Sequence, residues 1–248
     1  MLALLLWLAP LAGFADELRI MTSGTFTAAF LELAPRFERA TGHHAIAVTT
    51  TIGVGADAIP NRLRRHEPAD VVILDDDAMA QLVADGTVMP STRTPLARSG
   101  IGIAVRAGAA RPDISTVDAL RQTLLRAASV AYSGSVSGRY VSTELFERLG
   151  IAREMAGKSR RIERERVGAV VARGEAEIGF QQTSELLPVP GVDYVGPLPA
   201  DLQRVSVFSA AVAAHSDHRE AAAALIRFLA SADAAAAVAK TGLEPIAR

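Results

Sequence analysis

The spacing of apolar residues predicts alternating strands and helices from residue 18 onward. Residues 18–22 alternate apolar and polar positions, as a half-buried strand does, and after Ser23-Gly24-Thr25 the apolar positions recur at helical spacing as far as Phe37. Residues 71–74 form a continuous apolar run, which is typical of a strand buried on both faces. The order of strand, helix and strand indicates a parallel sheet covered by helices.

The same alternation continues to the end of the chain. Further strands are predicted at residues 45–51, 101–105, 129–132, 178–180, 194–195 and 205–214. Further helices are predicted at residues 58–65, 78–83, 117–127, 140–149, 167–173, 220–230 and 232–240. The pattern therefore predicts an α/β fold with two lobes, each a mainly parallel sheet flanked by helices, and a ligand cleft between the lobes.

The first 15 residues have the pattern of a secretory signal. An apolar run spans residues 2–11, and Gly13 and Ala15 place small residues three and one positions before a cleavage point. The run is shorter than the roughly 20 residues that cross a bilayer, although no positive residue precedes it. We predict a signal peptide at residues 1–15 and a periplasmic protein, with a buried N-terminal helix as the alternative.

Composition limits the classes of partner. Lys and Arg total 26 against 27 Asp and Glu, so no positive excess is present for binding nucleic acid. The absence of cysteine excludes disulfides and thiolate metal sites. The acidic run Asp75-Asp76-Asp77 follows a predicted strand, where a helix dipole favours carboxylates without any metal. We expect a monomer that binds a small anion, with no metal, no cofactor and no nucleic-acid partner.

Five separate segments carry a family resemblance. They are residues 18–38, 67–73 (EPADVVI), 96–105, 174–180 (GEAEIGF) and 225–229 (LIRFL). Together they resemble the type II periplasmic solute-binding proteins of the molybdate-binding kind. The resemblance implies two lobes joined by two crossovers, with residues 16–98 and 198–248 in the first lobe and 99–197 in the second. It also implies that the lobes close on a small oxyanion and deliver it to an ABC transporter permease.

The resemblance also implies where the ligand binds. Matching the family's donor positions selects Thr25, the segment Gly55-Ala56-Asp57, Ser137, and Gln182 in place of the usual tyrosine. The second of these loops has lost its serines. Arg139 adds a positive charge that a molybdate site does not need, and a guanidinium prefers planar carboxylates. We therefore expect a carboxylate rather than molybdate.

The candidate ligand-binding residues share a position at a loop, a helix start or a strand end beside the predicted cleft. They are Ser23, Gly24, Thr25, Asp57, Arg62, Ser135, Ser137, Gly138, Arg139, Gln181 and Gln182. Hydroxyls and backbone N–H groups at helix starts bind anions, and amides both donate and accept. The alternative is that the hydroxyls only cap helices and that the arginines lie on solvated helix faces.

A second function stays open beside solute capture. The chain is similar to a divergent branch of the same family that includes aconitate isomerase, which interconverts cis- and trans-aconitate without a cofactor. Such an enzyme needs a base beside the carbon that loses a proton. Asp57, Glu185, Tyr132 and Tyr140 are the titratable candidates, and the sequence does not choose among them. The predicted function is capture of a small anion for ABC-type uptake, with aconitate isomerisation as the alternative.

Overall fold

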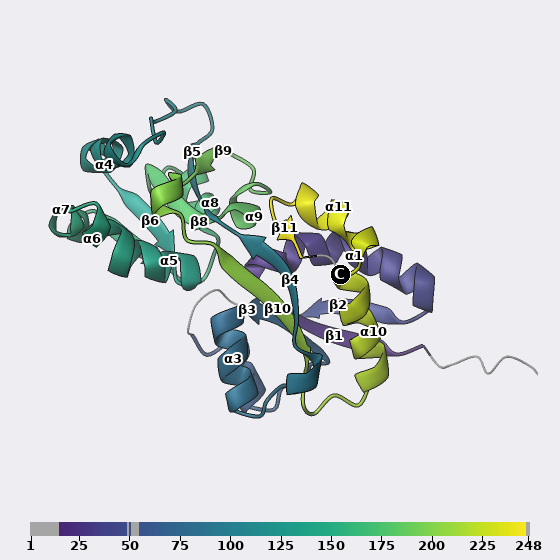
Figure 1. Cartoon of the computed structure of the whole chain (residues 1–248). Coiled ribbons are helices and arrows are strands. Elements are labelled where there is room, and N and C mark those ends of the chain that lie inside the picture. The colour runs from purple at the N-terminus through teal and green to yellow at the C-terminus, as the bar shows by residue number, and fades with distance from the viewer. Residues whose placement is uncertain (1–14, 49, 51–54, 247–248) are drawn as a thin grey trace, which may run out of the picture.

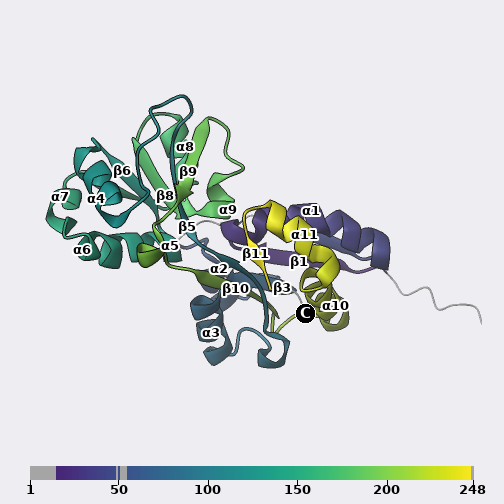
Figure 2. The ribbon, with the colours of Figure 1, turned by 45° about the horizontal axis from the view of Figure 1, so that its top comes forward.

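The protein folds into two lobes, each built on one sheet with helices on both faces (Figures 1 and 2). The computed structural model describes residues 15–48, 50 and 55–246. The predicted signal peptide therefore lies outside the described residues except for Ala15. The predicted two-lobed α/β fold is confirmed.

The first sheet has six strands in the order β11-β4-β10-β3-β1-β2. Their bounds are β1 (Glu17–Thr22), β2 (His44–Val48), β3 (Val71–Asp75), β4 (Thr94–Ser99), β10 (Ser206–Val212) and β11 (Glu244–Pro245). β1 pairs in parallel with β2 and β3, whereas β10 runs antiparallel to β3 and β4, and β11 antiparallel to β4.

The second sheet has five strands in the order β7-β6-β8-β5-β9. Their bounds are β5 (Ile101–Arg106), β6 (Val130–Ser133), β7 (Ser159–Ile162), β8 (Ile178–Gln182) and β9 (Val192–Pro197). β6 pairs in parallel with β7 and β8, and β5 runs antiparallel to β8 and β9. Both sheets are thus mixed rather than mainly parallel, because the strands next to the connections between lobes run against their neighbours.

The chain passes between the two sheets twice. It leaves the first sheet at Gly100, between β4 and β5, and returns after β9 through the short helix η3 (Ala200–Leu202) and Gln203. The side-chain amide of Gln203 accepts a hydrogen bond from Ile101 N–H at 2.8 Å and donates one to Ile101 O at 3.0 Å. The two connections are therefore hydrogen-bonded to each other. We propose that the lobe boundaries lie beside these connections, near residues 99 and 198.

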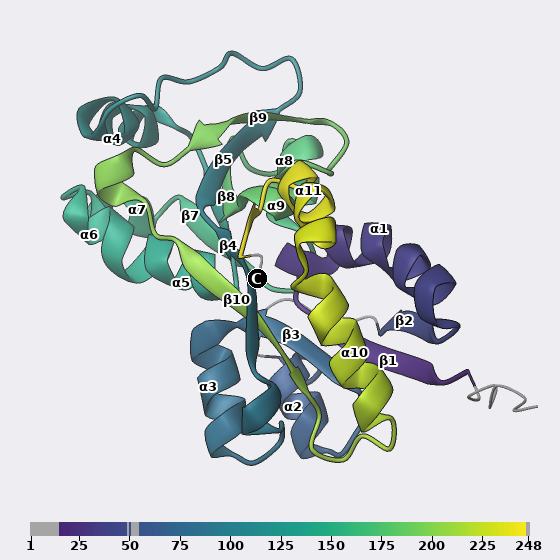
Figure 3. The same ribbon diagram turned by 45° about the vertical axis from the view of Figure 1, so that its right-hand side comes forward.

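Helices cover both faces of the first sheet (Figure 3). They are α1 (Gly24–Thr41), α10 (Arg219–Leu229) and α11 (Ala232–Lys240) on one face, and α2 (Ile59–Arg64) and α3 (Asp76–Ala84) on the other, with the short helix η1 (Pro90–Thr92) before β4. β3 shows why both faces are covered. Val71 and Ile73 are buried in the core with α1, while Val72 and Leu74 are buried in the core with α2 and α3. The predicted doubly buried strand is confirmed.

The second sheet is covered in the same way. One face carries α4 (Val117–Arg126), α5 (Val136–Tyr140), the π-helix η2 (Val141–Leu145), α6 (Phe146–Arg148) and α7 (Ala152–Ala156), and the other carries α8 (Val167–Ala172). The one-turn helix α9 (Thr183–Leu186) follows β8 and packs against α1 of the first lobe. It is the element that carries Glu185 to the boundary between the lobes.

One segment has more structure than its sequence predicts. The mixed-charge run at residues 158–166 contains edge strand β7 in its first half, a strand that the apolar pattern does not predict. Lys158 donates to the carbonyls of Leu125 and Ala127. Among the described residues, no single helix is long and apolar enough to cross a membrane. Only α10 and α11 together reach that length and composition, and they are bent by 67°.

Candidate functional site

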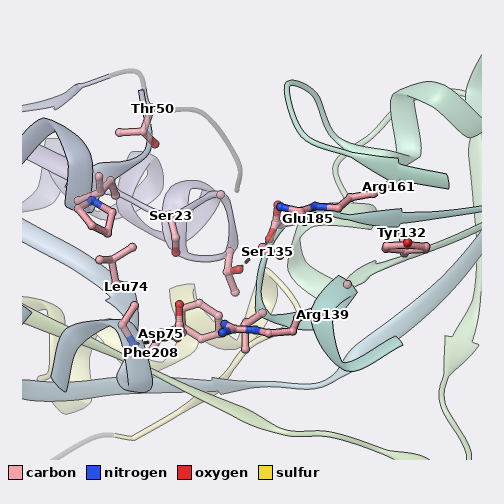
Figure 4. A pocket seen from close by; sticks show the side chains of 18 of the residues that line it. Ser23, Thr50, Leu74, Asp75, Tyr132, Ser135, Arg139, Arg161, Glu185 and Phe208 are labelled. Carbon is pink, nitrogen blue, oxygen red and sulfur yellow. Dashed lines mark hydrogen bonds between the residues drawn. The ribbon is translucent and has the colours of Figure 1, made fainter. Parts of the chain in front are cut away.

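A cavity of about 360 Å³ lies between the lobes, at the carboxyl ends of β1, β3 and β6 (Figure 4). The first lobe lines it with Ser23, Gly24, Thr25, Thr50, Ile59, Pro60, Leu74, Asp75, Ala78 and Phe208. The second lobe lines it with Tyr132, Gly134, Ser135, Val136, Gly138, Arg139, Ser142, Thr143, Arg161 and Glu185. The volume fits a small molecule, and six of the eleven predicted ligand-binding residues line the wall.

The start of α1 presents hydrogen-bond donors to this cavity. Ser23 is the N-cap residue, yet its side chain makes no capping bond. Its Oγ is buried and has no hydrogen-bond partner within the part of the chain that the structure describes. Gly24 and Thr25 follow it on the cavity wall. A long helix with open N–H groups at its start and an unpartnered hydroxyl beside them is a site for an anion.

The loop between β6 and α5 holds a cluster of serine hydroxyls. Ser133 Oγ lies 2.7 Å from Ser135 Oγ and 3.0 Å from Ser137 Oγ. Ser135 lines the cavity, whereas Ser137 is buried beneath it and does not. Gly138 packs so closely on β6 that an added Cβ would lie 1.6 Å from Ser133 O, so only glycine fits there. Ser137 therefore supports the loop, and Ser135 and Gly138 face the cavity.

Arg139 reaches from the second lobe toward the first. Figure 4 shows its side chain extending toward Asp75 and Phe208. Its guanidinium forms no hydrogen bond or ion pair with any other described residue. The backbone continues into the π-helix η2, where Ser142 and Thr143 donate to Arg139 O at 3.1 and 2.8 Å. π-helical turns often occur at functional sites. This one follows directly on α5, the helix that carries Arg139, whose donors are available to a ligand.

Asp75 is the carboxyl group that faces Arg139. It ends β3, and its Oδ1 accepts from Ala78 N–H at 3.1 Å, which caps α3. Burial raises the pKa of Asp75 above its ordinary range, while the Ala78 N–H and the positive charge of Arg139 act in the opposite direction. The sequence marked Asp75 only as a carboxylate at a helix start. The structure adds that it lies on the wall of the cavity.

Glu185 is the second carboxyl group of the wall, and it is only 2% exposed. Its Oε1 accepts from Thr25 Oγ1 at 2.8 Å, and its Oε2 accepts from Gln181 Nε2 at 2.6 Å. Next to it, Ser184 Oγ donates to Thr25 O at 2.8 Å. Burial raises the pKa of Glu185, although the hydrogen bonds and the charge of Arg166 lower it in part. These bonds join α9 of the second lobe to the start of α1.

Gly24 makes this junction possible. A Cβ at this position would lie 2.6 Å from Oε2 of Glu185, closer than van der Waals contact permits. The carboxyl group can therefore approach the start of α1 only because residue 24 has no side chain. Gln181 completes the arrangement, because its Oε1 accepts from Val167 N–H at 2.9 Å and this bond fixes its amide.

The remaining walls combine a second cation with apolar surface. Arg161 of β7 lines the cavity and forms a solvent-exposed ion pair with Glu163 at 3.1 Å. Ile59, Leu74 and Phe208 supply apolar side chains from the first lobe. Sequence reasoning did not single out Arg161, because the strand that carries it was not predicted. The residues at 159–162 show no alternation of apolar and polar positions that would have indicated a strand.

The other predicted site residues lie outside this lining. Asp57 is exposed before α2, and Arg62 forms an ion pair with Glu67 at 2.6 Å. Gln182 is fully buried, and its amide nitrogen can reach Ser99 Oγ at 2.8 Å. Tyr140, a candidate base, is buried and donates to Leu202 O at 2.6 Å. Of the four candidate bases, Tyr132 and Glu185 line the cavity.

Comparison with known proteins gives a consistent picture. The family described as bacterial extracellular solute-binding protein matches residues 18–244. A protein from a Pseudomonas species named aconitate isomerase is 48% identical over 247 residues, which cover 98% of this chain and 94% of that protein.

Solved structures agree on the fold. The periplasmic molybdate-binding protein of Azotobacter vinelandii has a TM-score of 0.71 at 18% identity, over 91% of this chain and 98% of that chain. The binding protein AgtB of A. tumefaciens R10, solved with agropinic acid, has a TM-score of 0.66 at 15% identity, over 94% of this chain and 84% of that chain. At these identities the likeness concerns the fold alone.

Proposed function

Because the chain belongs to the family of bacterial extracellular solute-binding proteins, we propose that it captures a small polycarboxylate in the cavity between its lobes. One observation carries the proposal. The start of α1, with the unpartnered Ser23 hydroxyl, and the guanidinium groups of Arg139 and Arg161 all meet at one small cavity. A ligand with several carboxylates can engage these separate positive regions together.

The chemistry of the wall favours a carboxylate over a tetrahedral oxyanion. A guanidinium matches the planar geometry of a carboxylate through two parallel hydrogen bonds. Ile59, Leu74 and Phe208 suit the carbon skeleton of an organic acid, whereas molybdate or sulfate has no apolar part.

The available donors are sufficient for useful affinity. A hydrogen bond to a charged group contributes about 1.5–3 kcal/mol, and a micromolar dissociation constant corresponds to about 8 kcal/mol. Arg139 alone does not reach that value. Together with Arg161, the Ser23 hydroxyl and the N–H groups of α1, the gross contribution exceeds that value, and the entropy lost on binding is subtracted from this sum.

A second function, isomerisation of aconitate, is favoured by a specific observation. The 48% identical relative is named aconitate isomerase, and Asp75 places a carboxyl group with a raised pKa inside the cavity beside Arg139. In this reaction a base takes a proton from the methylene carbon, and the charge spreads over the adjacent carboxylates. The proton then returns to the former alkene carbon, so the double bond moves and the geometry changes. Asp75 is the proposed base, and Arg139 stabilises the developing charge.

The same family membership supports a proposal for the cellular setting. We propose that the protein acts in the periplasm as a monomer, that residues 1–15 direct its export, and that an ABC transporter permease receives the ligand if capture is its only function. The permease contact and the isomerase activity make different demands. A transported ligand must leave unchanged, whereas a substrate leaves as its isomer.

Two measurements test these proposals. Calorimetric titration with tricarballylate, citrate, trans-aconitate, molybdate and sulfate should give heats of binding for the tricarboxylates and none for the two inorganic anions. Binding of molybdate alone would refute the carboxylate proposal. Proton NMR of cis-aconitate with a catalytic amount of protein should then show the trans isomer. Tight binding with an unchanged spectrum would support capture and exclude the isomerase.

A further inference from the structure

The hydrogen bonds around Glu185 leave one position for a proton. Gln181 Nε2 donates to Oε2, and the bond from Val167 N–H to Gln181 Oε1 prevents the amide from reversing. Oε1 instead lies 2.8 Å from the hydroxyl of Thr25. A hydroxyl both donates and accepts, whereas an amide nitrogen only donates. A proton on Glu185 therefore resides on Oε1, where Thr25 can accept it.

This arrangement links the protonation of Glu185 to the direction of the Thr25 hydroxyl. While Glu185 is ionised, the single hydrogen of that hydroxyl is donated to Oε1. When Oε1 carries a proton, Thr25 accepts from it and its own hydrogen is released for another acceptor. Thr25 and Glu185 both line the cavity, next to the unpartnered Ser23 hydroxyl. A carboxylate bound there is the acceptor that the released hydrogen would find.

We propose that Glu185 couples ligand binding to the uptake of one proton. A ligand carboxylate binds at the start of α1, a proton from solvent binds Oε1 of Glu185, and Thr25 then donates its hydrogen to the ligand. Glu185 is thus a positioning residue that acts through Thr25. The inference rests on the proposed binding of polycarboxylates, and it explains why an anion site has a carboxyl group in its wall.

The charges around Glu185 support this coupling. Burial already raises the pKa of the group, and Arg166, before α8, is the charged neighbour that opposes this effect. The contacts from α1 and β8 are the neutral Thr25 and Gln181. On β9, the Tyr194 hydroxyl contacts α9 at Thr183 rather than at Glu185. A ligand anion adds repulsion and raises the pKa of Glu185 further.

Three other charged groups share the cavity. Arg139 and Arg161 are cations, and Asp75 is a second carboxyl group with a raised pKa. Asp75 is therefore the competing site for a proton taken up on binding. The bond from Ala78 N–H engages Oδ1 of Asp75 and leaves its other oxygen able to take a proton, so the variants Glu185→Gln and Asp75→Asn distinguish the two sites.

The sign of the pH effect follows from linkage. In a window above the pKa of Glu185 in the free protein and below its pKa in the complex, the group is ionised without ligand and protonated with it. Within that window the dissociation constant rises as pH rises, by up to about tenfold per unit. Glu185→Gln mimics the protonated state, because its amide nitrogen donates to Thr25 and its oxygen accepts from Gln181.

Calorimetric titration with tricarballylate, which has no double bond to isomerise, tests the inference. At each pH of a series, titrations in two buffers of different ionisation enthalpy differ in heat by the number of protons taken up multiplied by the difference between those enthalpies. The window is found as the pH range in which this number is largest. We expect about one proton per ligand for the wild type and none for Glu185→Gln. The variant should bind as tightly as the wild type at low pH and more tightly at high pH.

Variants of Thr25 provide an independent readout. Thr25→Ser keeps a hydroxyl and should retain proton uptake, whereas the isosteric Thr25→Val should lose both the uptake and about tenfold in affinity. Persistent uptake in Glu185→Gln, or loss of uptake in Asp75→Asn instead, would overturn the inference. Binding of tricarballylate without proton uptake refutes the coupling alone, whereas absence of binding refutes the proposed function itself.

Discussion

The two carboxyl groups of the cavity, Asp75 and Glu185, differ in what surrounds them. Burial raises the pKa of both. Asp75 has one oxygen bonded to a helix N–H and faces Arg139 across the cleft. Glu185 has both oxygens bonded to side chains and joins the lobes. The same chemical group therefore has one environment that leaves it exposed to a ligand and one that holds it in the wall.

This difference teaches that a raised pKa does not define a role. An oxygen without a protein partner can take a proton from a bound molecule, whereas an oxygen already bonded to a hydroxyl reverses the direction of that hydrogen bond when it takes up a proton. Asp75 has the first kind of oxygen and Glu185 the second. Substitution of each carboxyl group by its amide separates the two roles, because the shape is kept and the titration is lost.

The largest difference is expected in catalysis. Asp75→Asn should lower the rate of aconitate isomerisation by about a thousandfold, because an amide cannot act as the base. Glu185→Gln should retain at least about a tenth of the wild-type rate, since it removes no base. Proton NMR gives both rates. Equal losses in the two variants would contradict the separation of roles, as would a fully active Asp75→Asn variant.

Arg139 is the next most sensitive position, because its charge acts on the ligand and on Asp75. Arg139→Ala should weaken tricarballylate binding about a hundredfold, and Arg139→Lys about tenfold, because lysine keeps the charge but not the paired donors. Calorimetric titration gives both values. Arg153→Ala, an exposed change on α7 away from the cavity, is the matched control and should bind normally. Normal binding by Arg139→Ala would place the arginine on a merely solvated face.

A substitution at Gly24 tests the hydrogen bonds of Glu185 that join the two lobes. Gly24→Ala places a Cβ 2.6 Å from Glu185 Oε2, so the carboxyl group must shift from Thr25 and Gln181. We expect a loss of about 1–3 kcal/mol in the free energy of unfolding, measured by denaturant titration. Gly157→Ala is the control, because nothing lies within 4 Å of its added Cβ. Similar stabilities for the two variants would show that Glu185 can adjust freely.

The smallest effect is the pH dependence of stability. The pKa of Glu185 in the folded protein lies above its ordinary value of 4.5, so the folded state binds more protons than the unfolded state between these two values. Stability is therefore greatest at low pH within that window and falls as pH rises through the folded pKa. Relative to wild type, Glu185→Gln should therefore gain stability as pH rises above 4.5, by about 1.4 kcal/mol for each unit by which folding raises the pKa of Glu185. Parallel pH profiles would mean that Glu185 does not titrate there.

The parts predicted from sequence depend on short-range patterns. The apolar run of β3 and the helical spacing of α1 were sufficient to predict these elements, because the burial of a strand or helix determines the spacing of apolar residues within that same segment. The loops at Ser23 and Ser135 were found for the same reason, since helix starts have local signals. The mixed direction of the sheets was not predicted, because pairing joins strands such as β4 and β10 that lie far apart in the chain.

The rest of the site depends on contacts between distant residues. Thr25 and Glu185 are 160 positions apart, and no pattern around either one indicates the other. Arg161 lies on a short edge strand whose polar composition is typical of a surface loop. Gln181 was predicted as a ligand contact, and its buried amide also donates to Glu185, a bond that its sequence context does not indicate. Sequence alone therefore located the loops and missed how the two lobes complete each other's wall.

The bonds between Gln203 and Ile101 have a mechanical consequence. Two independent connections would let the lobes slide or twist relative to each other. Because the two connections are hydrogen-bonded to each other, they act as a single seam. Thr183 N–H and its hydroxyl also bond to Gly100 O at 3.0 and 3.2 Å, so α9 begins at that seam. Two rigid lobes joined along one line separate by hinge rotation about it, so the distance between them grows with distance from the hinge. Glu185 lies two residues beyond Thr183, close to the hinge, where the lobes would separate least.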